Sequence, residues 1–265
     1  MVDGEAGVFR VAEMALHCLL VETDAGLVLI DTATGLRGVH QPQQWLGRAF
    51  LRMFRPVVGE DDTAVRQVEG MGFSRNDVRH VIPTHLDLDH AGGIADFPNA
   101  TVHVFGAELS AATNRLGLLA NFRFRPQQFA HHPVWSTYED TGETWLGFEN
   151  VQQMVGLPPE MLLVPLHGHT PGHAGVAINT GDGWLLHAGD AYMHRGEVDS
   201  DGPPCPMLID VHQSVMAATP SERRANRDRL QELNARHSDV AIFCAHSVTE
   251  FRSLRTAVPE DRQSS

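Results

Sequence analysis

The sequence predicts a layered α/β fold. Apolar runs of strand length recur along the chain, and they fall into two groups that are each followed by helical patterns. Hydrophobic residues make up 42% of the 265 residues, which is enough to bury a sizeable core. Sheets covered by helices satisfy this pattern best. At this length the chain could form one large domain or two smaller ones.

The first group of strands begins with a hairpin. The stretch ALHCLLVETDAGLVLIDTA consists of two apolar runs joined at residues 24–26, where Asp-Ala-Gly favours a tight turn. A helix is predicted over about residues 61–72 and ends at a glycine, and Ser74 can cap a short turn before a strand at 78–83. A further strand is predicted at 101–105.

The segment from Glu108 to Trp145 has a different character. Its stretch ANFRFRPQQFAHHPVW mixes aromatic residues, arginines and prolines without a clean period. Such a pattern favours helices and loops laid over a pocket rather than a core strand. A solvated insertion without a role is the alternative.

The second group of strands is predicted at residues 161–166, 175–180, 184–187 and 240–244. A helix should begin at Pro220, with Thr219 as its N-cap, and run to about Arg236.

Composition excludes several kinds of function. The formal charge is -13, and every basic residue is arginine because the sequence contains no lysine, which excludes Schiff-base and P-loop lysine chemistry. No basic run suggests a nucleic-acid partner. The cysteines are distant from one another and form no CxxC pair, so we expect buried thiols in a reducing compartment. Without a signal sequence or an apolar run of membrane-spanning length, we expect a cytoplasmic protein with no membrane partner.

A cluster of metal-ligating residue types follows the strand predicted at 78–83. The stretch VIPTHLDLDHAGG carries His85, Asp87, Asp89 and His90 at the carboxyl end of an apolar run, which is where α/β sheets bind ligands. The small residues after His90 would let the backbone and a helix N-terminus approach a charged group.

Further candidate ligands follow other predicted strands. PLHGHTPGHAG supplies His167, His169 and His173, LLHAGDAY supplies Asp190, and IFCAHS supplies His246. Because each lies just past an apolar run, the strand ends could gather them around one metal centre. The more isolated histidines are predicted to be structural: His17, His40, His103, His131, His132, His212 and His237.

The ordered set THLDLDHAGG, GHTPGH, HAGD and CAHS, together with LLVETDAGLVLIDT, resembles the metallo-β-lactamase superfamily over nearly the whole chain. The resemblance implies a single-domain, four-layer αβ/βα sandwich over residues 1–265, with a dinuclear metal site at one edge of its two sheets and a cap insertion at about 108–150. By the same resemblance, the first ion would be bound by His85, Asp87 and His169, the second by Asp89, His90 and His246, with Asp190 as the bridge. Asp31 and His173 would orient these ligands.

Asp87 departs from the usual family motif HxHxDH, which has a histidine there. An aspartate oxygen lies as many bonds from Cα as imidazole Nδ1, so a metal site should be preserved. The additional carboxylate favours iron or manganese, although zinc is still the first expectation for the two divalent ions. Flavodiiron proteins of the superfamily carry a carboxylate at this place and bind iron. Alternatively, Asp87 weakens the first site so that one ion binds.

The implied reaction is hydrolysis. Two divalent ions lower the pKa of a bridging water toward ~7, so hydroxide becomes the nucleophile. Asp89 would pass a proton to the leaving group, and Tyr192 could donate to a developing oxyanion. His194 and Arg195 could reach the substrate, with Arg195 pairing with a carboxylate. The alternative for the segment from Tyr192 to Arg195 is a surface loop.

A small lactone or ester is the leading substrate class. The chain lacks lysine and the C-terminal helical domain of glyoxalase II, which argues against glutathione thioesters. Phe124 and Trp135 in the cap segment would form an apolar cover, as in quorum-quenching lactonases. The only partner expected is a small-molecule substrate, and a homodimer is possible. The alternatives are a di-iron or mono-iron redox enzyme, a thioester, phosphodiester or β-lactam hydrolase, and a non-catalytic metal-binding member.

Overall fold

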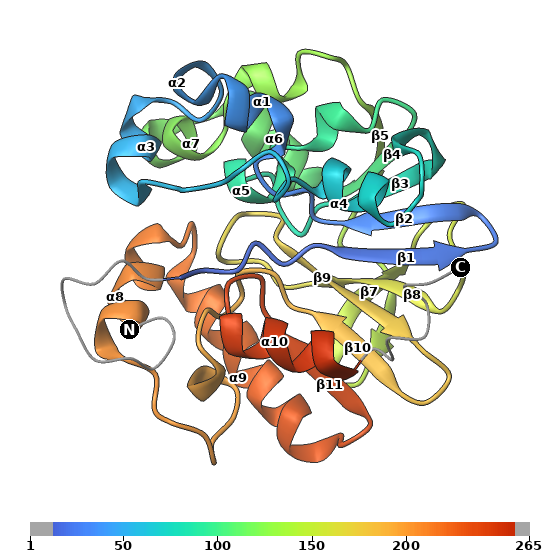
Figure 1. The fold of residues 1–265 in the computed structure, drawn as a ribbon. Coiled ribbons are helices and arrows are strands. Elements are labelled where there is room, and N and C mark those ends of the chain that lie inside the picture. The colour runs from blue at the N-terminus through green and yellow to red at the C-terminus, as the bar shows by residue number, and fades with distance from the viewer. Residues whose placement is uncertain (1–12, 258–265) are drawn as a thin grey trace. The chain divides into compact units, whose positions relative to one another are not determined.

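The computed structural model describes residues 13–257. These residues form two compact units (Figure 1). The β1–β5 unit comprises residues 18–141 and 152–159, and the β6–β11 unit comprises residues 13–17, 142–151 and 160–257. Each unit contains one sheet and its own helices.

The β1–β5 unit contains a five-stranded mixed sheet with the strands in sequence order. Its strands are β1 (Leu19–Thr23), β2 (Gly26–Ile30), β3 (Val78–Ile82), β4 (Thr101–Phe105) and β5 (Val134–Tyr138). β1 and β2 form the predicted hairpin, and β2 to β5 run parallel to one another. At the turn, Gly26 has φ +105°, a backbone conformation that glycine adopts without strain.

The helices of this unit are mostly short. They are α1 (Gly35–His40), α2 (Pro42–Trp45), α3 (Arg48–Phe54), α4 (Ala64–Gly70), α5 (Leu88–Ala91), α6 (Gly106–Asn114) and α7 (Gly117–Arg123), with 3₁₀ turns η1 (Arg75–Asp77), η2 (Ile94–Asp96) and η3 (Pro126–Phe129). α4 is the helix predicted over residues 61–72, and the Ser74 hydroxyl accepts a hydrogen bond from Asn76 N at 3.2 Å, which caps η1 as predicted.

The structure corrects one expectation for the segment 108–145. Its first part is helical, as predicted, but residues 134–138 form β5, which pairs along its whole length with β4. β5 is an edge strand in which only Tyr138 is buried. Because main-chain pairing rather than alternating burial stabilises such a strand, its sequence lacks the period that identifies buried strands.

The β6–β11 unit contains a six-stranded sheet in the order β11-β10-β9-β8-β7-β6. Its strands are β6 (Glu143–Trp145), β7 (Phe148–Gln153), β8 (Met161–Pro165), β9 (Ala174–Asn179), β10 (Trp184–His187) and β11 (Val240–Phe243). β10 and β11 are parallel, whereas β8, β9 and β10 are successively antiparallel. The four strands predicted here from the sequence are confirmed to within one residue at each end.

The helices of the β6–β11 unit are α8 (Met207–Met216), α9 (Pro220–Arg236) and α10 (Val248–Ala257), with the 3₁₀ turn η4 (Arg195–Glu197). α9 has the predicted bounds, although the side chain of its N-cap, Thr219, makes no capping hydrogen bond. Of the three cysteines only Cys244 is buried, whereas Cys18 and Cys205 are partly exposed.

Each unit has its own hydrophobic core. In the β1–β5 unit, apolar side chains of β2, β3 and β4 pack against α4 and the segments around them. In the β6–β11 unit, those of β7 to β11 pack against Leu230 and Leu233 of α9. Burial of each large aliphatic side chain contributes about 1.5–3 kcal/mol, so these cores fix the strands whose ends carry the candidate ligands.

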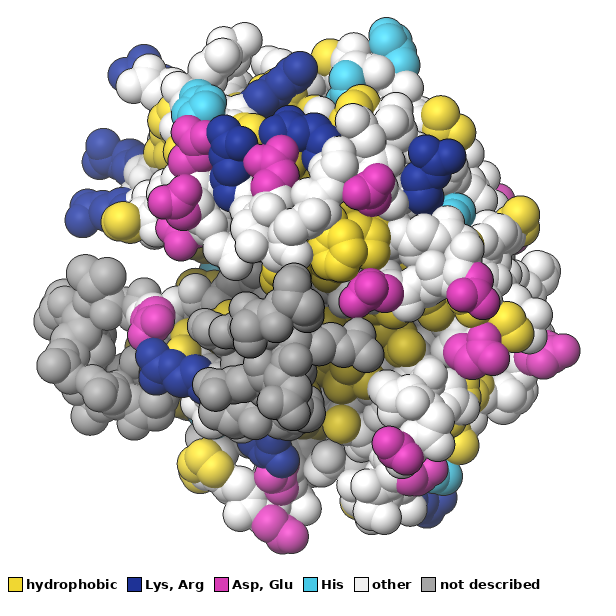
Figure 2. All heavy atoms as spheres, turned by 45° about the vertical axis from the view of Figure 1, so that its right-hand side comes forward, with side chains coloured by type: hydrophobic (Ala, Val, Ile, Leu, Met, Phe, Trp, Pro, Cys, Tyr) yellow, Lys and Arg dark blue, Asp and Glu magenta, His cyan; other side chains and the backbone are white. Residues whose placement is uncertain are grey.

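The surface shows no gathering of the negative charge on the face drawn in Figure 2. Acidic side chains are scattered over that face singly or in small groups, with arginines among them. Among the described residues, no helix is both long enough and apolar enough to cross a membrane.

Candidate metal centre

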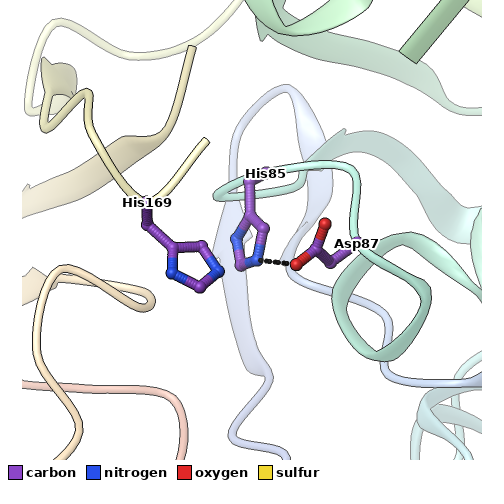
Figure 3. Close-up of side chains that lie close together, drawn as sticks. All are labelled: His85, Asp87 and His169. Atoms are coloured by element: carbon purple, nitrogen blue, oxygen red, sulfur yellow. Dashed lines mark ion pairs between the residues drawn. The ribbon is translucent and has the colours of Figure 1, made fainter. Parts of the chain in front are cut away.

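The loop after β3 carries four candidate ligands of the β1–β5 unit. His85 is fully buried, and Asp87 is the residue immediately before α5, the short helix that carries Asp89 and His90. The Nε2 atom of His85 lies 3.4 Å from Oδ2 of Asp87, as the dashed line in Figure 3 marks. The sequence motif therefore places its histidines and aspartates on one tight loop and helix turn.

Asp31, at the end of β2, fixes the orientation of this loop. Its carboxylate accepts hydrogen bonds from Thr84 N at 2.7 Å and from Thr84 Oγ1 at 3.1 Å, and it lies 2.9 Å from His90 Nδ1. An Nδ1–H donated to Asp31 leaves Nε2 of His90 as the lone-pair nitrogen that can bind a metal. Asp31 has φ +56°, which is strained for a non-glycine residue and is held by these contacts.

The two glycines after His90, Gly92 and Gly93, lie against the backbone that follows β2. A Cβ atom on Gly93 would lie 2.4 Å from Thr32 O, and one on Gly92 would lie 2.7 Å from Thr34 O. No larger side chain fits at these positions, because the backbone that follows β2 approaches them closely. A hydrogen bond from Thr32 N to His90 O, at 2.7 Å, joins the segment after β2 to α5.

Two charged residues that the sequence analysis did not single out contact this loop. Arg123, the last residue of α7, is buried, and its Nη1 donates a hydrogen bond to Oδ2 of Asp87. Glu108 of α6 is also buried and accepts a hydrogen bond from Leu86 N at 2.9 Å. No sequence motif marks either residue. Each lies in a segment that the sequence analysis predicted only as helices and loops.

The β6–β11 unit brings together the other three candidate ligands. Asp190 follows β10, and its two carboxylate oxygens face different histidines: Oδ2 lies 3.5 Å from Nε2 of His169, and Oδ1 lies 3.2 Å from Nε2 of His246. The Nδ1 atom of His246 is 2.9 Å from the carbonyl oxygen of Ala15, so donation there leaves Nε2 as the lone-pair nitrogen.

Both ring nitrogens of His173 contact main-chain atoms. Its Nδ1 lies 3.1 Å from the carbonyl oxygen of Leu166, and its Nε2 accepts a hydrogen bond from Asp190 N at 2.9 Å. These contacts join the end of β8 to the end of β10, which are the two strands that lead to His169 and Asp190. They are the contacts that an orienting residue would make.

The three residues after Asp190 that were expected to contact substrate each take part in a hydrogen bond within the protein. Tyr192 is fully buried, and its hydroxyl donates to Oε1 of Glu250 at 3.0 Å; burial, with the charge of Glu250, raises its pKa well above the usual value. His194 is buried and accepts from Gly196 N at 3.1 Å, and burial lowers its pKa. The Nε atom of Arg195 donates to Asp199 at 3.0 Å.

The two aromatic residues predicted for the cap lie in the β1–β5 unit. Phe124 is only 2% exposed and belongs to the hydrophobic core. Trp135 on β5 is partly exposed and packs edge-on against Phe129, with ring centroids 5.4 Å apart. Phe124 thus packs in the core, whereas part of Trp135 can contact a small molecule.

The residues present fit a metal ion. Ligands at about 2.0–2.1 Å from one ion, with angles between about 90° and 110°, lie about 2.9–3.4 Å apart. The His85–Asp87 and His246–Asp190 atom pairs, at 3.4 and 3.2 Å, lie within this range, and the His169–Asp190 pair, at 3.5 Å, lies just above it. Imidazole nitrogens combined with carboxylate oxygens suit zinc, iron or manganese. At Asp87 the Arg123 guanidinium also contacts the same oxygen.

Comparison with known proteins agrees with this geometry. The sequence model of the metallo-beta-lactamase superfamily matches residues 14–225. A protein of Mycobacterium tuberculosis named probable metallo-hydrolase is 40% identical over 255 residues, which cover 95% of this chain and 80% of that relative. An N-acyl homoserine lactonase of Bacillus cereus is 26% identical over 191 residues, covering 72% of this chain and 69% of the relative.

The fold is also that of a solved lactonase. The structure of a variant of AiiA from Bacillus thuringiensis, with N-decanoyl-L-homoserine bound at its active site, superposes with a TM-score of 0.71 at 22% identity, covering 95% of this chain and 89% of that one. At this identity the likeness speaks for the fold alone. Together with the family match, it shows that the chain belongs to the metallo-beta-lactamase superfamily, with that family's α/β fold, and is a metallo-hydrolase.

Proposed function

We propose that the protein is a dinuclear metal-dependent hydrolase that cleaves a lactone or another small ester. The observation that supports this most directly is the placement of Asp190, whose two oxygens face two different histidines at 3.5 and 3.2 Å. A carboxylate that is shared in this way between two ligand sets is what a bridging ligand of two ions requires.

The proposed ligand assignment follows the family resemblance. The first ion would be bound by His85, Asp87 and His169, and the second by Asp89, His90 and His246, with Asp190 shared. The Asp31 contact to His90 and the Ala15 contact to His246 support this assignment because each sets the ring tautomer that leaves Nε2 for a metal. We propose zinc as the metal, with iron or manganese as the alternatives.

A bound pair of divalent ions would supply hydroxide at neutral pH and polarise the scissile carbonyl. The chain's own contribution to proton transfer would come from Asp89. This aspartate is on α5, its side chain is 25% exposed, and its Oδ2 lies 3.9 Å from Nε2 of His90. An exposed carboxylate on the same helix turn as a buried ligand can reach a leaving group without leaving the site.

The substrate class is proposed from the relatives. Proteins named N-acyl homoserine lactonase match by sequence, and a related structure holds N-decanoyl-L-homoserine. We therefore propose a small lactone or ester as the substrate.

The test is metal analysis of protein purified without added metal, together with turnover on a panel of lactones, thioesters, phosphodiesters and β-lactams. We expect about two ions per chain and the highest kcat/KM on a lactone or small ester. Asp190→Ala should lose both metal and turnover, because one carboxylate serves both ligand sets. His237→Ala, a partly exposed histidine outside the ligand set, is the control and should retain both.

Several results would contradict the proposal. A content of one ion after metal supplementation would show a mononuclear enzyme. A clear preference for thioesters or phosphodiesters would replace the substrate class. Iron with visible absorption and no hydrolysis of any ester would favour the redox alternative.

A further inference from the structure

The family's motif has a neutral histidine where this chain has Asp87, and the structure shows what accompanies that exchange. Asp87 is 8% exposed and Arg123 is 4% exposed, and they form an ion pair through Nη1 of Arg123 and Oδ2 of Asp87. Arg123 is the last residue of α7 and lies 36 positions after Asp87 in the sequence. A buried positive charge therefore lies directly against the one ligand that departs from the motif.

Such a partner stabilises a buried carboxylate. A carboxylate that is buried without compensation is strongly unfavourable, and removing one member of a buried pair leaves the other as an uncompensated charge. An arginine side chain is always protonated, and its planar guanidinium donates in a fixed direction, so it also restricts the orientation of the carboxylate that it contacts.

The position of Arg123 is itself fixed by the fold. The main-chain N–H of Phe124 donates to Ala120 O at 2.9 Å, which continues the hydrogen bonding of α7 past Arg123. The ring of Phe124 is part of the core of the β1–β5 unit. The hydrogen bond and the burial of the Phe124 ring together fix the backbone next to Arg123, so the Arg123 side chain is held beside Asp87.

We infer that Asp87 and Arg123 together take the place of one histidine. This inference rests on the proposed metal centre. Asp87 adds one negative charge relative to the family's neutral imidazole, and Arg123 returns it, so the pair carries the same net charge as the residue that it replaces. Arg123 is a positioning residue that acts through Asp87, and the metal preference should follow that of the histidine-bearing relatives rather than shift towards iron.

A double-mutant cycle tests this coupling. The variants are Arg123→Gln, Asp87→His and the double variant Asp87→His/Arg123→Gln, with Arg123→Lys as the conservative replacement. Arg125→Gln is the matched control because Arg125 lies on the same segment and donates to Gln44 O rather than to Asp87. The readouts are metal content, metal affinity by competition with a chelator, and Tm measured with and without metal.

We expect Arg123→Gln to weaken metal binding about 10–100-fold, the range typical of residues that orient a ligand. Asp87→His alone should lower Tm because it removes the carboxylate of Asp87 from its buried ion pair with Arg123. The double variant should recover both metal affinity and Tm relative to either single variant, and Arg125→Gln should match the wild type. Arg123→Lys, which retains the charge, should bind metal better than Arg123→Gln.

The inference is overturned if Arg123→Gln binds metal like the wild type, or if the effects of the two single variants simply add in the double variant. A failure of Arg123→Gln to fold would not prevent the test, because the double variant is then expected to fold and bind metal. These readouts do not depend on the substrate. A protein that shows the coupling but hydrolyses no lactone would contradict the proposed substrate only.

Discussion

Tyr192→Phe separates two roles for the tyrosine that follows Asp190. The sequence resemblance predicts a hydroxyl that stabilises an oxyanion, whereas the structure shows a hydroxyl that is fully buried and donates to Oε1 of Glu250 at 3.0 Å. A buried hydrogen bond to a carboxyl group contributes about 1.5–3 kcal/mol. At about 2–4 °C per kcal/mol for a chain of this size, its loss should lower Tm by roughly 3–12 °C.

The pH dependence of this loss identifies its cause. Burial raises the pKa of Glu250, and the hydrogen bond from Tyr192 opposes that rise. Without the hydroxyl the folded-state pKa should rise further, and a carboxyl whose folded pKa is raised loses stability as the pH increases through that pKa. The destabilisation caused by Tyr192→Phe, measured by urea unfolding, should therefore be larger at pH 8 than at pH 5.

Tyr138→Phe provides the same chemical change at a distance from Asp190. Its hydroxyl lies 2.7 Å from Nδ1 of His103, whose pKa is lowered by burial to about 4. Because His103 is neutral at both pH 5 and pH 8, the effect of Tyr138→Phe should stay constant over this range. We expect kcat/KM of Tyr192→Phe to stay within about threefold of the wild type. A fall of about 100–1,000-fold in kcat with unchanged stability would refute this reasoning and establish the oxyanion role.

Two further predictions follow from burial. Phe124→Ala should lower the unfolding free energy, measured by chemical denaturation, by about 3–5 kcal/mol because Phe124 lies in the core. Trp135→Ala should lower it less and should instead change KM or the preferred acyl length, measured by kinetics on a lactone series. The unfolding free energy should also decrease by about 3 kcal/mol as the pH falls from about 6.5 towards 4, because His103 binds a proton more weakly when folded; this decrease should disappear in His103→Phe.

Much of the fold could be predicted because its strands bury apolar side chains on both faces or end at clear turns. β8 to β11 and α9 have nearly the bounds that the sequence indicates. α8 was not predicted because its apolar residues do not define one buried face of a helix. Four of them are exposed: Met207, Leu208, Val211 and Val215. The strand β5 was not predicted because main-chain pairing stabilises an edge strand without requiring an alternating pattern of apolar side chains.

The candidate ligands could be predicted because histidine and aspartate are concentrated immediately after strands, where sheet ends place side chains together. The residues that support them could not. Tyr192 and Glu250 are 58 positions apart in sequence. They meet because β10 and β11 pair in parallel, which brings the loop after β10 next to α10, the helix that follows β11. Sequence spacing carries no information about such a pair.

Asp87 shows what chemistry alone could have predicted and what it could not. The exchange of a neutral histidine for an aspartate in a buried motif adds a charge, and burial of an uncompensated charge is prohibitive. The sequence therefore requires positive charge beside Asp87. A bound metal ion would supply part of it, and because the sequence contains no lysine, a partner from the chain's own side chains is an arginine or a histidine. Which one it is depends on how α7 packs against the ligand loop, and that packing selects Arg123. Where a motif departs from its family by one unit of charge, the compensating residue is the first to seek in the structure, because the departure and its compensation must be changed together for the site to survive.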